Sequence, residues 1–289
     1  MTNHRHGLAR IQVAATLRRM REEAGLPRDA AARELYCTVS KIGDIETGRS
    51  GVKPAELEKL LDLYGAAEHD RQALVETARE ARRRRRVAAN IPVSRRRYVD
   101  LETQARAITF FSPGLLPPTL QTDRYARELL EWSGRLSVAE VDARLAVRAA
   151  LRKNLARVDP PSYWCILGEA TLRANVGGAA VMAEQLEYLL EWSRTMHHLV
   201  IQVLPLGSGA HGFMGWTHTL LRFDPPAPDV LHMESSVRDL FFDGEAEVRE
   251  VAEKLELMKA QAIGRNESLA LIRDILAEYK EASGHARLA

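Results

Sequence analysis

Cysteine is scarce in this sequence, and long apolar runs are missing. The 289 residues include only Cys37 and Cys165, which lie far apart and in unlike surroundings. Two such residues exclude a disulfide framework or a zinc site built from thiolates. No run approaches the roughly 20 apolar residues that a membrane-spanning helix needs, and the first residues do not form a signal peptide. We therefore expect a cytoplasmic protein without membrane contact.

Net charge is also small, but it is unevenly distributed. The chain carries 41 basic and 39 acidic residues, a formal charge of +2. Residues 1–100 hold 21 basic and 14 acidic residues, or +7, which leaves −5 for the remainder. A basic segment favours contact with nucleic acid, so the first third of the chain is expected to face it. The length favours two globular domains.

Two short helices joined by a tight turn are predicted over residues 26–48, LPRDAAARELYCTVSKIGDIETG. Small and apolar residues at helical spacing give the pair an inward edge: Ala31, Ala32, Leu35, Ile42 and Ile45. Thr38 can cap the second helix, which begins near Val39, and Gly48 suits the left-handed residue after its end. An ordinary helical hairpin is the alternative to a DNA-binding motif.

Further helices are predicted on both sides of this pair. One contains Val13, Leu17 and Met20, another begins at Pro54, and a third runs on from Asp70. Together they predict a five-helix domain over residues 1–81, in which residues 1–8 form a mobile arm. Five consecutive arginines follow, and residues 82–97 are predicted to be a flexible basic linker, which could lie in solvent or add phosphate contacts.

The pattern of residues 26–49 resembles the helix-turn-helix of the lambda, 434 and Xre repressor type. This resemblance implies that the second helix enters the major groove of double-stranded DNA. It places Thr38, Val39, Ser40, Gly43 and Asp44 at base edges, and Arg28, Lys41 and Arg49 near the backbone. Asp44 would accept from the amino group of cytosine. Tyr36 stands where the family has Gly, so we expect the turn to be built differently here.

The remainder, residues 98–289, resembles the domain of unknown function that follows an Xre-type helix-turn-helix in many actinobacterial regulators. The segments that carry the resemblance are YVDLETQARAITFFSPGLLPPTLQTDRYARELL, EATLRANVGG, QLEYLL, IQVLPLGSGAHG and HMES. The resemblance implies control of transcription, often with a small partner protein, and implies neither a known ligand nor a catalytic residue.

Periodicity predicts that this second domain is α/β. Helices are predicted from Asp123, as a cap, and from Ser137, with further helices around Val181–Leu189, Val248–Met258 and Leu269–Tyr279. Strands are predicted over 163–167, 199–204, 217–223 and 230–233, the first two parallel. The expected fold class is therefore mainly α, with a helix-turn-helix domain and a mixed α/β regulatory domain.

Candidate sites in the second domain are a glycine-rich loop and a basic ridge. The loop GSGAHGFMGW follows a predicted strand, so His211, Phe213 and Trp216 could line a ligand pocket or form a lid, although a loop without a ligand is the alternative. Arg144, Arg148 and Arg152 recur every four residues and could bind a small acidic partner, or form a solvated face.

The sequence predicts no metal, cofactor or enzyme activity. His197, His198, His211, His218 and His232 lack the spacing of a helical metal pair. Acidic residues at predicted strand ends (Glu169, Glu234, Asp239 and Asp243) more commonly cap helices or pair with Arg173 and Arg238 than perform acid–base chemistry.

The predicted function is sequence-specific DNA binding by a dimeric transcriptional regulator. One short recognition helix contacts only about four base pairs, so pairing on a two-fold symmetric site is expected. The second domain would sense a ligand or bind a small protein. The alternative is an interaction module whose chief role is to bind a small acidic partner, with DNA contact secondary.

Overall fold

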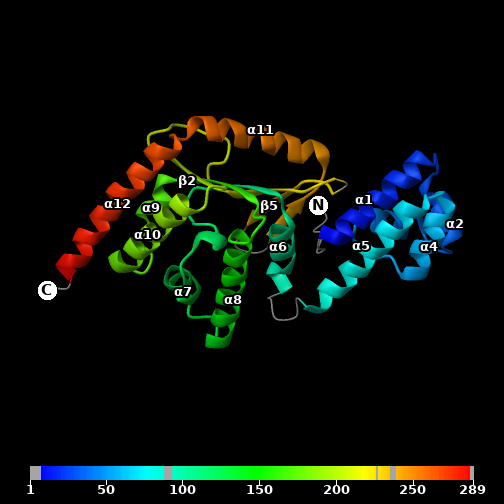
Figure 1. The fold of residues 1–289 in the computed structure, drawn as a ribbon, viewed down its shortest axis with the longest axis horizontal. Helices are drawn as coiled ribbons and strands as arrows, with labels where there is room; N and C mark the ends of the chain where they lie inside the picture. Colours follow the sequence, from blue (N-terminus) through cyan, green and yellow to red (C-terminus); the bar gives the residue numbers. More distant parts are fainter. Residues whose placement is uncertain (1–7, 88–92, 226, 235–238, 287–289) are drawn as a thin grey trace. The chain divides into compact units, whose positions relative to one another are not determined.

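The computed structural model describes residues 8–87, 93–225, 227–234 and 239–286, which combine many helices with one mixed sheet (Figure 1). Two compact units are formed, one from residues 1–104 with 223–228 and one from 105–222 with 229–289. None of the helices in the described part of the chain has the length and apolar character needed to cross a bilayer. The predicted fold class, mainly α with an α/β C-terminal domain, is confirmed.

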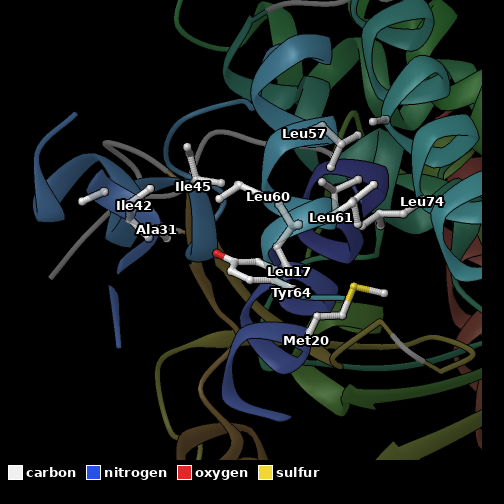
Figure 2. Close-up of a cluster of buried hydrophobic side chains, with 13 residues drawn as sticks. Leu17, Met20, Ala31, Ile42, Ile45, Leu57, Leu60, Leu61, Tyr64 and Leu74 are labelled. Carbon is white, nitrogen blue, oxygen red and sulfur yellow. The ribbon is translucent and has the colours of Figure 1, made fainter. Parts of the chain in front are cut away.

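The first unit consists of helices. They are α1 (Leu8–Glu23), α2 (Arg28–Glu34), α3 (Val39–Glu46), α4 (Pro54–Leu63), α5 (Glu68–Val87) and α6 (Val93–Gln104). The first five are the helices that the sequence predicts for a helix-turn-helix domain. Their shared core is apolar, and Figure 2 shows side chains such as Leu17, Ile45 and Leu60 meeting from three helices.

The described residues of the basic segment 82–97 are helical, and a linker role for this segment stays a prediction. Residues 82–87 continue α5, residues 93–97 begin α6, and residues 88–92 lie outside the described ones. Of the predicted arm, Leu8 is a buried residue of α1, whereas residues 1–7 also lie outside the described part. The division into a DNA-binding domain (1–81), a basic linker (82–97) and a regulatory domain (98–289) stays a prediction.

The second unit is built on a six-stranded sheet in the order β3-β2-β1-β4-β5-β6. Its strands are β1 (Ala107–Ser112), β2 (Ser162–Gly168), β3 (Leu199–Leu204), β4 (Thr217–Arg222), β5 (Val230–Glu234) and β6 (Asp239–Phe242). β1, β2 and β3 are parallel, and the other three pair antiparallel. The four predicted strands and the parallel β2–β3 pair are confirmed. β1 and β6 were not predicted.

Helices cover this sheet. They are α7 (Asp123–Glu131), α8 (Val138–Leu155), α9 (Glu169–Arg173), α10 (Ala179–Thr195), α11 (Glu245–Gln261) and α12 (Arg265–Ala286), with a short 3-10 helix η2 (Pro118–Leu120). Figure 1 shows α11 running across one face, where Leu255 and Met258 pack with Phe111 and Leu220 of the strands. Thr122, rather than the predicted Asp123, caps α7, because its hydroxyl accepts from the amide of Tyr125.

Candidate nucleic-acid interface

The turn between α2 and α3 places a tyrosine in the left-handed conformation. Tyr36 has φ +51°, and in the part of the chain that the structure describes it is the only residue other than glycine with a positive φ. The amides of Tyr36 and Cys37 donate to the carbonyl groups of Arg33 and Ala32, which closes α2 as a Schellman motif normally does with glycine. The expectation that this turn is built differently was therefore wrong: the turn keeps its geometry and accepts a bulky residue.

α3 begins at the predicted residue and exposes its first turn. The hydroxyl of Thr38 accepts from the amide of Lys41 at 3.2 Å, which satisfies one of the unpaired amides of the helix. Ile42 and Ile45 are almost fully buried in the helical core. Thr38, Val39 and Ser40 are exposed. The helix therefore has a buried apolar edge and an accessible N-terminal end, as insertion into a groove requires.

Glu46, the last residue of α3, connects three helices through buried charge. Its Oε1 lies 2.5 Å from Nε of Arg21 on α1, and its Oε2 accepts from Nε of Arg28 on α2 at 2.8 Å. The carboxylate side chain is 1% exposed. Burial by itself would raise the pKa of Glu46, but the hydrogen bonds from Arg21 and Arg28 outweigh it and hold that pKa below its ordinary value.

The cations predicted to approach the DNA backbone each have a carboxylate partner within the chain. Lys41 Nζ lies 2.6 Å from Oε1 of Glu56 on α4, and Arg49 Nε lies 3.4 Å from Oδ1 of Asp44. Arg28 is shared with Glu46, yet its side chain stays 41% exposed. The structure thus gathers these cations around α3. The contact between Glu56 and Lys41 could not be predicted from sequence spacing, because their helices meet only in the fold.

Two family models match this chain. Residues 12–74 match a helix-turn-helix domain, and residues 95–274 match a domain of unknown function, DUF5753, over more than half of the chain. The chain belongs to the DUF5753 family. The comparisons found no similar curated protein and no similar solved structure. The predicted combination of a helix-turn-helix with a C-terminal domain of unknown function is confirmed, and helix-turn-helix domains are characteristic of DNA-binding regulators.

In the DUF5753 domain, two of the three ridge arginines are bound to a neighbouring segment. Arg152 donates to the carbonyl oxygen of Gln121 and lies 2.6 Å from Oδ1 of Asp123. Arg148 donates to the side-chain oxygen of Gln121 at 2.8 Å. Arg144 donates to the carbonyl oxygen of Glu140, one turn back on the same helix. Two members of the ridge therefore hold the N-terminal end of α7 against α8.

The glycine-rich loop of the DUF5753 domain is anchored to the core by Phe213. This side chain is 4% exposed, and its ring centroid lies 4.2 Å from that of His218 and 5.7 Å from that of Phe111. His211 packs edge-on against Phe111. Trp216 and Met214 are exposed instead. His211 and Phe213 thus share Phe111 as a neighbour, whereas Trp216 is exposed, and a ligand role for the three residues stays a prediction.

Acidic and histidine residues of the DUF5753 domain are placed in structural contacts. Glu169 pairs with Arg173 at 2.7 Å, and its other oxygen accepts from the amide of Leu206. The hydrogen bond from Arg173 is the main cause of a lowered pKa of Glu169, and the hydrogen bond from the amide of Leu206 lowers that pKa further. Asp239 lies 3.1 Å from His232 between β6 and β5. Within the described ranges, no three His, Cys, Asp or Glu residues are grouped as a metal site would need.

Proposed function

We propose that this chain is a sequence-specific transcriptional regulator that binds double-stranded DNA with α3 in the major groove. The observation that carries the proposal is the exposed, Thr38-capped first turn of α3 above a buried Ile42–Ile45 edge. An exposed N-terminal turn is the part of a recognition helix that contacts base edges. Ser40 supplies a donor and an acceptor there, and the neighbouring cations supply phosphate contacts.

The proposed active form is a homodimer. A single short helix contacts about four base pairs, which is too few for useful discrimination, and a two-fold protein doubles the site. The DUF5753 domain would provide the dimer contact and a surface for a ligand or for a small acidic protein. Mass photometry of the full chain with and without DNA tests this part, and a complex with one chain per operator would contradict it.

The direct test is selection of duplexes from a random pool with the full chain, followed by gel-shift titration. A two-fold symmetric site should be enriched, and Ser40→Ala with Lys41→Ala should remove the preference for it. Ser133→Ala with Lys153→Ala is the matched control, because it deletes the same groups from exposed positions in the DUF5753 domain. Equal affinity for every duplex would refute the proposal.

A further inference from the structure

Val39 is an exposed apolar residue at the tip of the proposed recognition helix. It is the first residue of α3, and 49% of it is accessible, whereas Ile42 and Ile45 of the same helix are 1% and 2% accessible. Its side chain therefore contributes little to the core of the first unit. Cα–Cβ bonds of a helix tilt toward its N-terminus, so a side chain at the first position points past the end of α3.

Gly43 leaves open space on the same face of α3. It follows Val39 by four residues, which places the two one above the other on the helix surface. A Cβ added at Gly43 would meet no atom within 4 Å, and the φ of this residue is not positive, so neither packing nor the backbone requires glycine here. Glycine inside a helix costs about 1 kcal/mol relative to alanine. Because Gly43 has no side chain, base edges in the major groove could approach Val39 closely along this face of α3.

We propose that Val39 packs against the C5-methyl group of a thymine in the major groove, across the open face left by Gly43. This inference rests on the proposed function. The side chain of valine has no donor or acceptor, and among the four standard bases only thymine exposes a methyl group in the major groove. Ser40, the exposed neighbour, can bond to other base edges, whereas Val39 can gain only from burial. Each half-site thus contains a thymine that is distinguished by its methyl group.

The test compares thymine with deoxyuridine at one position of the selected site. Deoxyuridine removes the methyl group and keeps every hydrogen-bonding atom. Wild-type chain should bind the deoxyuridine duplex about fourfold more weakly, as expected for one methyl-sized group left unburied. Val39→Ala should bind the two duplexes equally. Val138→Ala is the matched control, since Val138 is also an exposed first residue of a helix that a hydroxyl side chain caps.

A second variant separates the contact from folding. Gly43→Ala adds a methyl group that meets no atom of the chain, so the melting temperature should not fall. The added group should nevertheless hold the base edge away from Val39 and reduce the fourfold discrimination. A duplex carrying 5-methylcytosine at the same position tests the other natural source of the methyl group, and tighter binding to it than to thymine would overturn thymine as the ligand.

The outcomes also distinguish this inference from the function on which it rests. Failure of the wild-type chain to enrich any site contradicts DNA recognition itself. An enriched site with equal affinity for thymine and deoxyuridine leaves DNA recognition standing and overturns the methyl contact. A thymine preference that Val39→Ala retains in full overturns the assignment to Val39.

Discussion

Arg21 and Glu46 form a buried ion pair that joins the first helix of the helix-turn-helix domain to the end of α3. Their side chains are 8% and 1% exposed, and Arg21 donates from Nε at 2.5 Å and from a terminal nitrogen at 3.0 Å. Arg28 adds a third hydrogen bond to the same carboxylate. The orientation of α3, including its exposed first turn, therefore depends on the carboxylate of Glu46, which is too buried to contact DNA.

Removing the charge of Glu46 should loosen this domain. Glu46→Gln removes the carboxylate that Arg21 and Arg28 share, and it leaves Arg21 the longer 3.5 Å contact with the carboxylate of Glu22. Loss of one partner of a buried pair typically costs about 3–5 kcal/mol. Hydrogen exchange of the full chain at neutral pH should show faster exchange in α1, α2 and α3, with α10 unchanged. Glu34→Gln, an exposed change on α2, is the control. Unchanged protection in α3 would contradict this role for Glu46.

Acid should destabilise the same domain through the same carboxylate. The folded-state pKa of Glu46 lies below its ordinary value, so the stabilisation is complete above about pH 4.3, the ordinary glutamate pKa. It is lost as the pH falls through the lower, folded value. Methyl NMR should show Ile42 and Ile45 moving toward unfolded positions in that range. Glu46→Gln should remove this acid-dependent loss, and an identical profile in both proteins would argue against Glu46 as its source.

The left-handed turn at Tyr36 predicts a measurable conformational cost. A residue with a Cβ at φ +51° pays about 1–2 kcal/mol that glycine does not. Tyr36→Gly and Tyr36→Ala both remove the ring that Lys59 approaches at 5.5 Å, so their difference isolates the backbone contribution. The glycine variant should be the more stable by about 1 kcal/mol in urea unfolding followed by circular dichroism. Equal midpoints would show that the turn relaxes when the tyrosine is replaced.

Much of the first domain was predictable because its signals are local. The Thr38 cap, the left-handed Gly48 and the spacing of Ile42 and Ile45 each specify a helix end or a buried edge within a few residues. Glu46 belongs to the recognised pattern, but its partners lie 25 and 18 residues earlier in the sequence. Such ion pairs form only when helices pack, so periodicity could not identify them.

The second domain was less predictable at its sheet edges and centre. β1 lies inside the sheet, between the parallel strand β2 and the antiparallel strand β4. Its sequence AITFFS lacks the alternation that marks a half-buried strand, since nearly all its residues are buried. β6 has only four residues. Asp123 was a plausible cap by residue type, but Thr122 directly before it is equally suited, and only the observed hydrogen bond decides between them.

Neutralising Glu56 should strengthen DNA binding if Lys41 contacts phosphate. In the free chain Glu56 is the ion-pair partner of Lys41, and its other oxygen accepts from the amide of Lys53 at the start of α4. Glu56→Gln keeps an acceptor for that amide and frees the lysine charge. Affinity for the selected duplex should rise several-fold, with a salt dependence steeper by up to one counterion. Glu58→Gln is the control, because Glu58 pairs with Arg71. If Glu58→Gln raised the affinity more than Glu56→Gln did, the gain would come from the change in net charge and not from release of Lys41.

Single substitutions in the arginine ridge should show that Arg152 stabilises the second domain and that Arg144 does not. Arg152 bridges the carbonyl of Gln121 and the carboxylate of Asp123, so Arg152→Ala should lower the stability of the second domain by about 1–3 kcal/mol. Arg144 donates to the carbonyl oxygen of Glu140, which belongs to the same helix, so Arg144→Ala should change the stability little. All four tryptophans follow residue 104, so thermal unfolding monitored by their fluorescence reports on this domain. Equal shifts in both variants would contradict the division. Binding of an acidic partner to the ridge is therefore best tested with Arg144→Glu. If the Arg152 variant lost binding, the loss could come from unfolding of the domain instead of from a missing contact with the partner.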